Sequence, residues 1–344
     1  MSQSWDTLLG PAVQVQAAHR AGLDALFAGA RPANAFAICG LWEPFFVQAS
    51  DEDLDRCLSQ VLGSLPDRLA RAADEVTFYP LVVDFWPLGV HFVDSLFGAR
   101  VYPYDGNFWS DPLPGGLADL RPVDFTSSPL VRWTLDAMLR LAEALPEPIA
   151  LCGPVLASPL NIAVNILGQQ ALVELTRPGE PELRGLRIIT DAIRGLHDLV
   201  RATLPEGRYR FYCSCNRFAP DGFGHICGCS TQLVGPETYA AHLAPLDAAV
   251  LAVYPEGGTI HLCGHHTQHL PCWREMRGLR GVQLNDAAAD DFRAYFEGLR
   301  DDQVIYIAPT PRMTAGEILR LSGGRRVVLQ MALDRPLSLR DEHD

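Results

Sequence analysis

A histidine and a cysteine lie two positions apart at the end of a short apolar segment. Gly258-Thr259-Ile260 leads directly into His261-Leu262-Cys263-Gly264. In an extended chain, residues two apart place their side chains on the same face. An imidazole and a thiolate held a few Å apart suit zinc. We therefore expect His261 and Cys263 to bind a metal or to contact a substrate. The alternative is a core histidine bonded to a backbone carbonyl.

Four further cysteines lie upstream of this pair, and they enlarge the set of metal donors. Cys213 and Cys215 flank one serine at strand spacing, so both side chains can face the same way. Cys227 and Cys229 flank Gly228 in a segment that we interpret as a loop, which is a poor place to bury an apolar side chain. We expect the latter two to be metal ligands or a redox pair, and the former two to be ligands or structural residues.

Composition narrows the class of protein and its partners. The chain has 344 residues, 48% of them hydrophobic, with a net charge of −13 and no lysine- or arginine-rich segment. Nucleic acid and anionic membranes attract basic surfaces, so we expect neither as a partner. The nine cysteines are an odd number and favour reduced thiols over a disulfide framework. No basic segment followed by an apolar one opens the chain, so we expect a cytoplasmic protein.

Strand-like segments alternate with longer helical patterns. The strand-like segments are 34–39, 76–83, 149–152, 209–213, 259–263, 281–284, 304–307 and 326–331. The helical patterns are 11–27, 50–73, 88–97, 129–144, 161–175, 180–202, 236–252, 267–277, 287–299 and 314–321. Two other stretches, 100–125 and 214–235, are predicted to be irregular.

Eight strands separated by helices predict an α/β protein with a parallel (β/α)8 TIM barrel. We expect a helical extension over residues 1–33 and one barrel domain over residues 34–344. An open, doubly wound sheet is the competing fold.

Reactive side chains follow the predicted strands, at the end where barrel enzymes place their active sites. We expect Asp84 and Glu43 to act as acid, base or hydrogen-bond anchor, and the alternative for both is to cap the helix that follows. The predicted substrate-binding residues are Trp42, Trp86, Phe218, Phe223 and Asn285. Cys39 and Cys152 lie in apolar surroundings and are expected to pack as small buried side chains.

The chain resembles the uroporphyrinogen decarboxylase superfamily, which includes the methylcobamide:thiol methyltransferases. The resemblance covers about residues 34–333 and rests on short motifs. These are Pro87-Leu88-Gly89-Val90, Leu96-Phe97-Gly98-Ala99, Cys152-Gly153-Pro154, Val234-Gly235-Pro236-Glu237-Thr238-Tyr239 and Ile260-His261-Leu262-Cys263-Gly264. The last motif is similar to the His-x-Cys-Gly strand of the methyltransferase branch. The resemblance implies a (β/α)8 barrel with its site at the carboxyl ends of the strands.

The methyltransferase branch also implies a zinc ion held by this histidine and cysteine and by a second, much later cysteine. The later position falls near Pro309-Thr310-Pro311-Arg312, and no cysteine follows Cys272. Either an upstream cysteine of the set 213, 215, 227 and 229 replaces it, or the pair has another role. The decarboxylase branch implies an arginine-rich motif near residues 40–46, but that segment is aromatic and acidic. Decarboxylation is therefore the less favoured activity.

The leading hypothesis is zinc-dependent methyl transfer to a small-molecule thiol, with a corrinoid on a partner protein as one source of the methyl group. The alternative is a cysteine-based metal-binding, redox or sulfur-handling protein on the same barrel. If one ion is shared, a sulfur of Cys227 or Cys229 should lie within about 4 Å of the Cys263 sulfur.

Overall fold

The structure is a computed structural model that describes residues 5–40, 44–154, 156–210 and 215–339. Trp42, Glu43 and Cys213, three of the predicted site residues, lie outside these ranges, as does the side chain of Cys215.

A six-stranded parallel sheet forms much of the fold. Its strand order is β1-β12-β11-β10-β9-β8. The strands are β1 (Phe36–Ile38), β8 (Gly224–Cys227), β9 (Gly258–Leu262), β10 (Leu279–Leu284), β11 (Val304–Ile307) and β12 (Val327–Gln330). Parallel pairing needs a crossover between strands, and helices supply it here.

Two further parallel strands, β3 (Val82–Asp84) and β7 (Ala150–Cys152), pair with each other. Single parallel bridges link this pair to both edges of the larger sheet. Ile38 of β1 bridges to Phe78, shortly before β3. Ala157, shortly after β7, bridges to Cys227 of β8. The segments that flank the β3–β7 pair thus contact both edges of the six-stranded sheet through isolated bridges.

The strands have two different faces. Alternate side chains such as Ile260, Leu262 and Ile305 pack with the helices in the main core, and we call this side the outer face. The intervening side chains, such as Val304 and Tyr306, belong to a separate apolar cluster, and we call this side the inner face. This alternation follows from the two-residue period of a strand.

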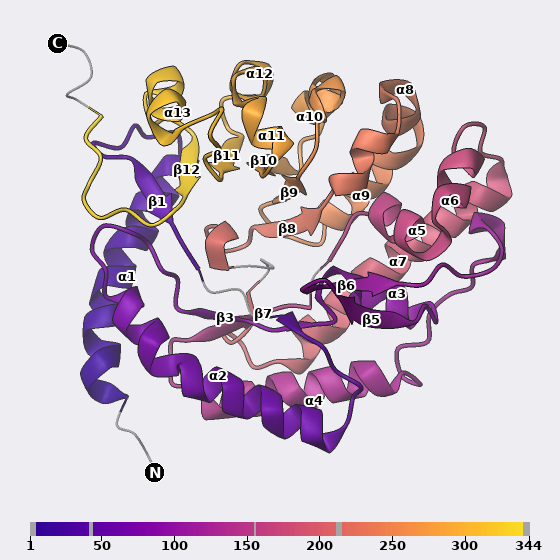
Figure 1. Ribbon diagram of the computed structural model, residues 1–344, viewed down its shortest axis with the longest axis horizontal. Coiled ribbons are helices and arrows are strands. Elements are labelled where there is room, and N and C mark those ends of the chain that lie inside the picture. The colour runs from indigo at the N-terminus through magenta and orange to yellow at the C-terminus, as the bar shows by residue number, and fades with distance from the viewer. Residues whose placement is uncertain (1–4, 41–43, 155, 211–214, 340–344) are drawn as a thin grey trace.

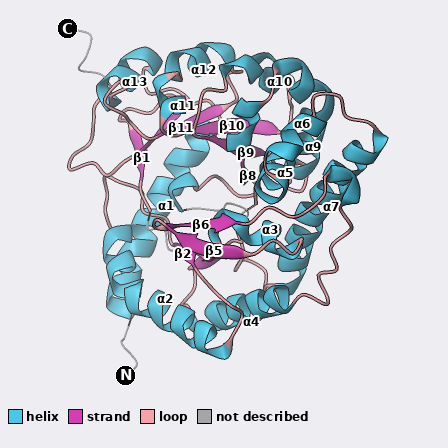
Figure 2. Ribbon diagram, turned by 45° about the vertical axis from the view of Figure 1, so that its right-hand side comes forward, coloured by secondary structure: helices cyan, strands magenta, loops and turns pink. Residues whose placement is uncertain are grey.

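Helices cover the outer face (Figures 1 and 2). The α-helices are α1 (Asp6–Phe27), α2 (Asp51–Ala72), α3 (Phe92–Leu96), α4 (Pro129–Ala144), α5 (Pro159–Leu167), α6 (Gln169–Glu174), α7 (Glu180–Thr203), α8 (Pro236–Thr238), α9 (Ala244–Leu251), α10 (Leu270–Glu275), α11 (Ala287–Asp290), α12 (Phe292–Gly298) and α13 (Ala315–Ser322). The shorter helical turns are η1 (Gly89–His91), η2 (Leu117–Asp119), η3 (Cys215–Arg217), η4 (Cys229–Leu233), η5 (Tyr239–Leu243) and η6 (Thr267–His269).

Helix α1 packs partly against the inner cluster. Its residues Leu23, Leu26 and Phe27 lie in the inner cluster, where the Phe27 ring meets Phe223 edge-on at 4.9 Å. The helix also lies beside the start of β1, since a Cβ at Gly22 would meet the Phe36 ring at 3.3 Å. The N-terminal helix is thus part of the packed core.

Local sequence explains where the longer helices begin and end. Ser50 caps α2, because its hydroxyl accepts a hydrogen bond from the Asp53 N–H. Gly168, with φ of 61°, separates α5 from α6. We had predicted one helix over 161–175. A glycine in this backbone conformation ends a helix readily, which explains the division.

One correction to the predicted strands concerns the segments 209–213 and 214–235. The predicted strand 209–213 contributes one bridge, from Tyr209 to Leu151, within the described residues. The strand lies instead at β8, inside the segment 214–235 that was predicted to be an irregular loop. Only Ile226 of β8 is strongly apolar, so the segment lacks the usual strand signal.

A second correction concerns the segment 100–125, which contains an antiparallel hairpin. Its strands are β5 (Val101–Tyr104) and β6 (Asn107–Ser110). The two turn residues, Asp105 and Gly106, both have positive φ, which is the geometry of a type I′ hairpin turn. The remaining short pair is β2 (Pro44–Phe45) with β4 (Trp86–Pro87).

Across the described ranges, no helix is both long enough and apolar enough to cross a bilayer.

Candidate metal centre

Three sulfurs and one imidazole meet at the carboxyl ends of β8 and β9. Cys227 is the last residue of β8, Cys229 begins η4, and Cys263 follows β9 directly. The Cys229 sulfur lies 3.9 Å from that of Cys227 and 3.2 Å from that of Cys263. The Nε2 atom of His261 lies 2.9 Å from the Cys263 sulfur. The predicted approach of a loop cysteine to Cys263 is therefore confirmed.

These side chains have the donor set of a metal site. Donor atoms of Cys227, Cys229 and His261 lie within 4.8 Å of one another, so the three residues could hold a metal ion. In a tetrahedral zinc site with Zn–S bonds of about 2.3 Å, two sulfurs are about 3.8 Å apart. The separation of 3.9 Å between Cys227 and Cys229 matches this value. Cys263 lies beside this group, with its sulfur in contact with Cys229 and with His261.

Glycine 228 allows the cysteine loop to lie against β9. The N–H of Gly228 donates a hydrogen bond of 2.9 Å to the carbonyl of His261. A Cβ at this position would lie 2.5 Å from the side chain of Ile260. Any larger residue would push the loop away from β9 and separate the two cysteines that flank it from the histidine.

A buried hydrogen-bond network joins the two loops that carry the cysteines. The Thr231 hydroxyl donates to the carbonyl of Gly228 and accepts from Nδ1 of His266, both at 2.8 Å. Nε2 of His266 accepts from the N–H of Gly264 at 3.3 Å. Burial lowers the pKa of His266 to about 3, so the ring is neutral and keeps this lone pair. The network fixes η4 relative to the loop that follows β9.

The three sulfurs have different proton affinities. Hydrogen bonding with the Cys229 thiol lowers the pKa of Cys263 to about 5 and that of Cys227 to about 6, and the single S–H proton of Cys229 points to one of these sulfurs at a time. These bonds raise the pKa of Cys229 itself, because they stabilise its protonated form. Cys227 and Cys263 are therefore the sulfurs that lose their protons most readily, and the thiolate is the form that binds a metal.

The pKa of His261 responds to these thiolates. Burial alone would lower it, but the charges of Cys227 and Cys263 raise it above its usual value. On the other side of the ring, Nδ1 is hydrogen-bonded to the side-chain oxygen of Gln283. Nε2 is thus the nitrogen that faces the sulfurs.

A chain segment between α7 and β8 lies against the inner face. Phe218 is buried in the inner cluster, and its carbonyl accepts a hydrogen bond of 2.6 Å from the Tyr306 hydroxyl. The guanidinium of Arg217 lies 3.3 Å from Nε2 of His225, and Nδ1 of His225 is 2.7 Å from the Thr259 hydroxyl. Burial holds the pKa of His225 well below its usual range, which keeps the ring neutral.

The other predicted site residues lie at several places. Asp84 is fully buried on β3 and accepts a hydrogen bond of 2.6 Å from the Cys152 thiol. Trp86 is buried in β4 and packs against Val90. Asn285 follows β10, and its side chain donates to Asp286 at 3.0 Å. Their proposed roles stay predictions.

Two of the predicted substrate-binding residues, Phe218 and Phe223, belong to the inner cluster. Phe218 meets the ring of Phe78 edge-on at 5.2 Å, and Phe223 packs against Phe27 of α1. They pack among the apolar side chains beside α1, and their contact with a substrate stays a prediction.

Sequence reasoning missed the residues that orient the donors, namely Gln283 and the pair Thr231 and His266. The one available signal was Gln283 itself, a polar side chain inside the apolar segment Gly281-Val282-Gln283-Leu284. Its partner His261 could be identified only from the register of β9 with β10.

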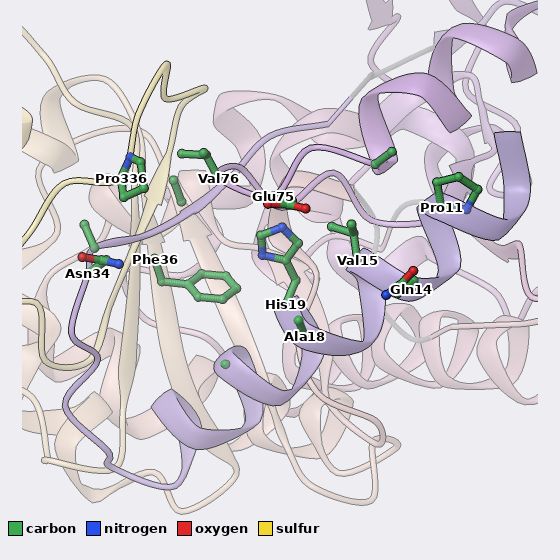
Figure 3. A pocket seen from close by; sticks show the side chains of 14 residues that line it. Pro11, Gln14, Val15, Ala18, His19, Asn34, Phe36, Glu75, Val76 and Pro336 are labelled. Atoms are coloured by element: carbon green, nitrogen blue, oxygen red, sulfur yellow. The ribbon is translucent and has the colours of Figure 1, made fainter.

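A cavity of about 640 Å³ lies elsewhere, between α1, β1 and residues 73–76 (Figure 3). Its fourteen lining residues include one histidine, His19, and one carboxylate, Glu75, but no cysteine. Nε2 of His19 is 2.9 Å from the Asp74 carbonyl, and its ring stacks on Phe78 at 5.2 Å. Since His19 already serves to pack α1, the sulfur cluster is the better candidate for chemistry.

Comparison with known proteins supports the fold class. No protein-family model matches this chain, and no curated protein matches it in sequence. Among solved structures, the chain is similar to a methyltransferase from Methanosarcina mazei, with a TM-score of 0.58 and 13% sequence identity. The similarity covers 93% of each chain. The two proteins share a fold. The predicted α/β class is confirmed.

Proposed function

We propose that this protein is a zinc-dependent methyltransferase that delivers a methyl group to a small-molecule thiol. The observation that carries the proposal is the convergence of Cys227, Cys229, His261 and Cys263 at the ends of two adjacent strands. The shared fold with a methyltransferase, which extends over 93% of the chain, supports the reaction class.

The proposal includes a closed (β/α)8 barrel. The strands β1, β3, β7, β8, β9, β10, β11 and β12 would form its wall, and the bridges at Phe78 and Ala157 support the closure. The four donors would then lie at the carboxyl ends of the strands, where barrel enzymes bind their substrates.

Cys227, Cys229, His261 and Cys263 offer one donor more than the three protein ligands that catalytic zinc sites use. We propose that three of them hold the ion and that the fourth position is left for the substrate. A zinc ion bound there would lower the pKa of an entering thiol, so that the thiol binds as a thiolate.

The reaction is a substitution at carbon. The acceptor sulfur forms a bond to the methyl carbon, while the bond from that carbon to its donor breaks with its electron pair. The thiol proton leaves to solvent. A methyl corrinoid on a partner protein is our candidate donor, and Asp84 and Glu43 are our candidates for orienting the polar part of the substrate.

Metal content and methyl transfer test the proposal together. Purified wild-type protein should hold about one zinc per chain, and His261→Ala and Cys227→Ser should lose it. Cys272→Ser is the matched control, because Cys272 lies on α10 outside the cluster, and it should keep its zinc. With methylcobalamin as donor and 2-mercaptoethanol as acceptor, only zinc-loaded protein should form the thioether. A folded wild type with no affinity for zinc would overturn the proposal.

A second candidate function is thiol redox chemistry, and the contact of 3.2 Å between the Cys229 and Cys263 sulfurs favours it. Hydrogen peroxide would then oxidise the two thiols to a disulfide, with two molecules of water as the other product. Peptide mapping of peroxide-treated protein decides between the functions. Rapid formation of this disulfide in protein purified without metal favours redox chemistry, and slow formation in zinc-loaded protein favours the transferase.

A further inference from the structure

A row of polar side chains crosses the inner face from the metal donors to the segment before β8. Nδ1 of His261, on β9, is hydrogen-bonded to the side-chain oxygen of Gln283, on β10. The Gln283 amide donates to the side-chain oxygen of Gln330, on β12, at 2.6 Å. The Gln330 amide in turn donates to the backbone carbonyl of Asn216 at 2.7 Å. We call these four residues the amide relay.

The backbone carbonyl of Asn216 determines which atom of each side chain in the relay donates and which accepts. A backbone carbonyl can only accept a hydrogen bond, so Gln330 must turn its NH2 group toward Asn216. The oxygen of Gln330 then faces Gln283, which must donate to it. The oxygen of Gln283 is left to face His261, and the imidazole must present an N–H to it.

This direction determines which nitrogen of His261 carries a proton. With Nδ1 as the donor to Gln283, a neutral ring has its lone pair on Nε2. Nε2 is the atom that lies 2.9 Å from the Cys263 sulfur, among the other donors. The relay therefore presents an electron pair, and not an N–H, to the sulfur cluster.

Burial protects the hydrogen bond between His261 and Gln283 from water. Gln283 is 2% exposed and His261 is 7% exposed, so water does not replace either partner freely. The two residues are also directly opposite one another in the β9–β10 ladder. The backbone therefore fixes the position of the His261 ring relative to the Gln283 amide. In the opposite tautomer the lone pair of Nδ1 would face the lone pairs of the Gln283 oxygen with no proton between them, so this tautomer is disfavoured.

We propose that Gln283 is a positioning residue that holds His261 in the Nδ1–H form, and that Gln330 and Asn216 hold Gln283 in the orientation needed for this. The link to metal binding rests on the proposed function, whereas the tautomer itself does not. Partners of this kind raise the affinity of a histidine ligand for its metal, and their loss lowers it by about 10- to 100-fold.

Two substitutions at Gln283 and one at Gln330 test the proposal. Gln283→Leu keeps the size of the side chain but removes the acceptor, and we expect zinc affinity to fall by about 10- to 100-fold. Gln283→Glu keeps an acceptor for His261 and should recover most of this loss. Gln330→Leu leaves Gln283 free to turn, and we expect a smaller loss than in Gln283→Leu.

A matched control separates this effect from a loss of packing. Gln303 is another fully buried glutamine, and its amide donates to the carbonyls of Trp273 and Leu279. Gln303→Leu should lower the melting temperature without changing zinc affinity. Zinc affinity is measured by competition with a chromophoric chelator, and the ligand field is followed by the visible absorption of the cobalt(II)-substituted protein.

The tautomer is measured directly on metal-free protein. At pH 9, nitrogen-15 NMR of the histidine rings should show His261 with a protonated Nδ1 and an unprotonated Nε2, and Gln283→Leu should show a mixture of both forms. An Nε2–H form in the wild type, or wild-type zinc affinity in a folded Gln283→Leu variant, would overturn the proposal. If the wild type binds no zinc, the proposed function fails, while the NMR measurement still decides the relay.

Discussion

His261 and Gln283 are opposite one another across the β9–β10 ladder, and Nδ1 of the histidine is hydrogen-bonded to the oxygen of the glutamine. The orientation of a candidate metal ligand is therefore set by the pairing of two strands. The sulfur donors are held differently, because Cys229 and Cys263 lie just beyond strand ends. For these, hydrogen bonds and close packing between loops do the positioning, and the next two predictions test those contacts.

Thr231→Val should weaken both the fold and metal binding. The valine keeps the shape of the side chain but removes the hydroxyl that joins Gly228 to His266. The buried Nδ1–H of His266 would lose its acceptor, at a cost of about 1–3 kcal/mol. We expect a lower melting temperature in calorimetry and a several-fold loss of zinc affinity.

Thr190→Val is the control for this change. Thr190 is buried in α7, and its hydroxyl donates to the carbonyl of Leu186 in the same helix. This variant should change stability only modestly and leave zinc affinity as in the wild type. Equal zinc affinity in both variants would contradict a role for Thr231 in positioning the donors.

Gly228→Ala should disrupt the cluster while leaving all four donors in the sequence. The new methyl group would lie 2.5 Å from the Ile260 side chain, so the loop must move away from β9. We expect zinc affinity to drop at least tenfold, measured by chelator competition. Gly63→Ala is the control, because no atom lies within 4 Å of its Cβ position in α2. That change should leave zinc binding unaltered and add about 0.5–1 kcal/mol of stability, since alanine favours a helix over glycine.

Because of the raised pKa of Asp247, the free energy of unfolding should fall as the pH rises from about 4 to about 7. Burial raises the pKa of Asp247 from 3.8 to about 7, even though the Tyr239 hydroxyl donates to its carboxylate at 2.7 Å. In this interval the folded protein keeps a proton that the unfolded chain has released, so the free energy of unfolding falls. Each unit of pKa difference corresponds to about 1.4 kcal/mol.

Asp247→Asn should remove this pH dependence, since the amide keeps an oxygen for Tyr239 and carries no charge. At pH 8 the variant should be more stable than the wild type in urea unfolding, and near pH 4 the difference should vanish or reverse. Asp198→Asn, at an exposed ion pair with Arg201, should keep the wild-type slope. A wild-type slope in Asp247→Asn would show that another group causes the pH dependence.

Ser50→Ala should cost about 1 kcal/mol, because the Asp53 N–H at the start of α2 would lose its capping hydroxyl. Chemical unfolding measures the change. Ser59→Ala, at an exposed position within the same helix, is expected to be neutral or slightly stabilising because alanine is the better helix former. A similar loss in both variants would contradict the capping role.

Much of the fold could be predicted because its elements have strong local patterns. The segment 304–307 was predicted with the bounds of β11, since three of its residues are β-branched and the fourth is a tyrosine. The strand β8 could not, because two of its four residues, His225 and Cys227, are not strongly apolar and so break the apolar pattern.

The candidate site could be predicted in part for a related reason. His261 and Cys263 are two residues apart, and this spacing can be read directly from the sequence. Their side chains could therefore be predicted to lie on the same face from the sequence alone. The contact of Gln283 with Gln330 joins residues 47 positions apart on strands that are not adjacent in the sheet. No local pattern encodes such a contact, because it depends on the curvature of the whole sheet.

The position of α1 has a consequence for the side from which a small molecule can reach the sulfurs. Three apolar side chains of this helix pack beside the inner aromatic residues and close that side of the inner face, namely Leu23, Leu26 and Phe27. A small molecule that reaches the sulfurs is then expected to approach from the carboxyl ends of the strands, where Cys227 and Cys263 lie. Changes in α1 should therefore alter stability before they alter access to the sulfurs.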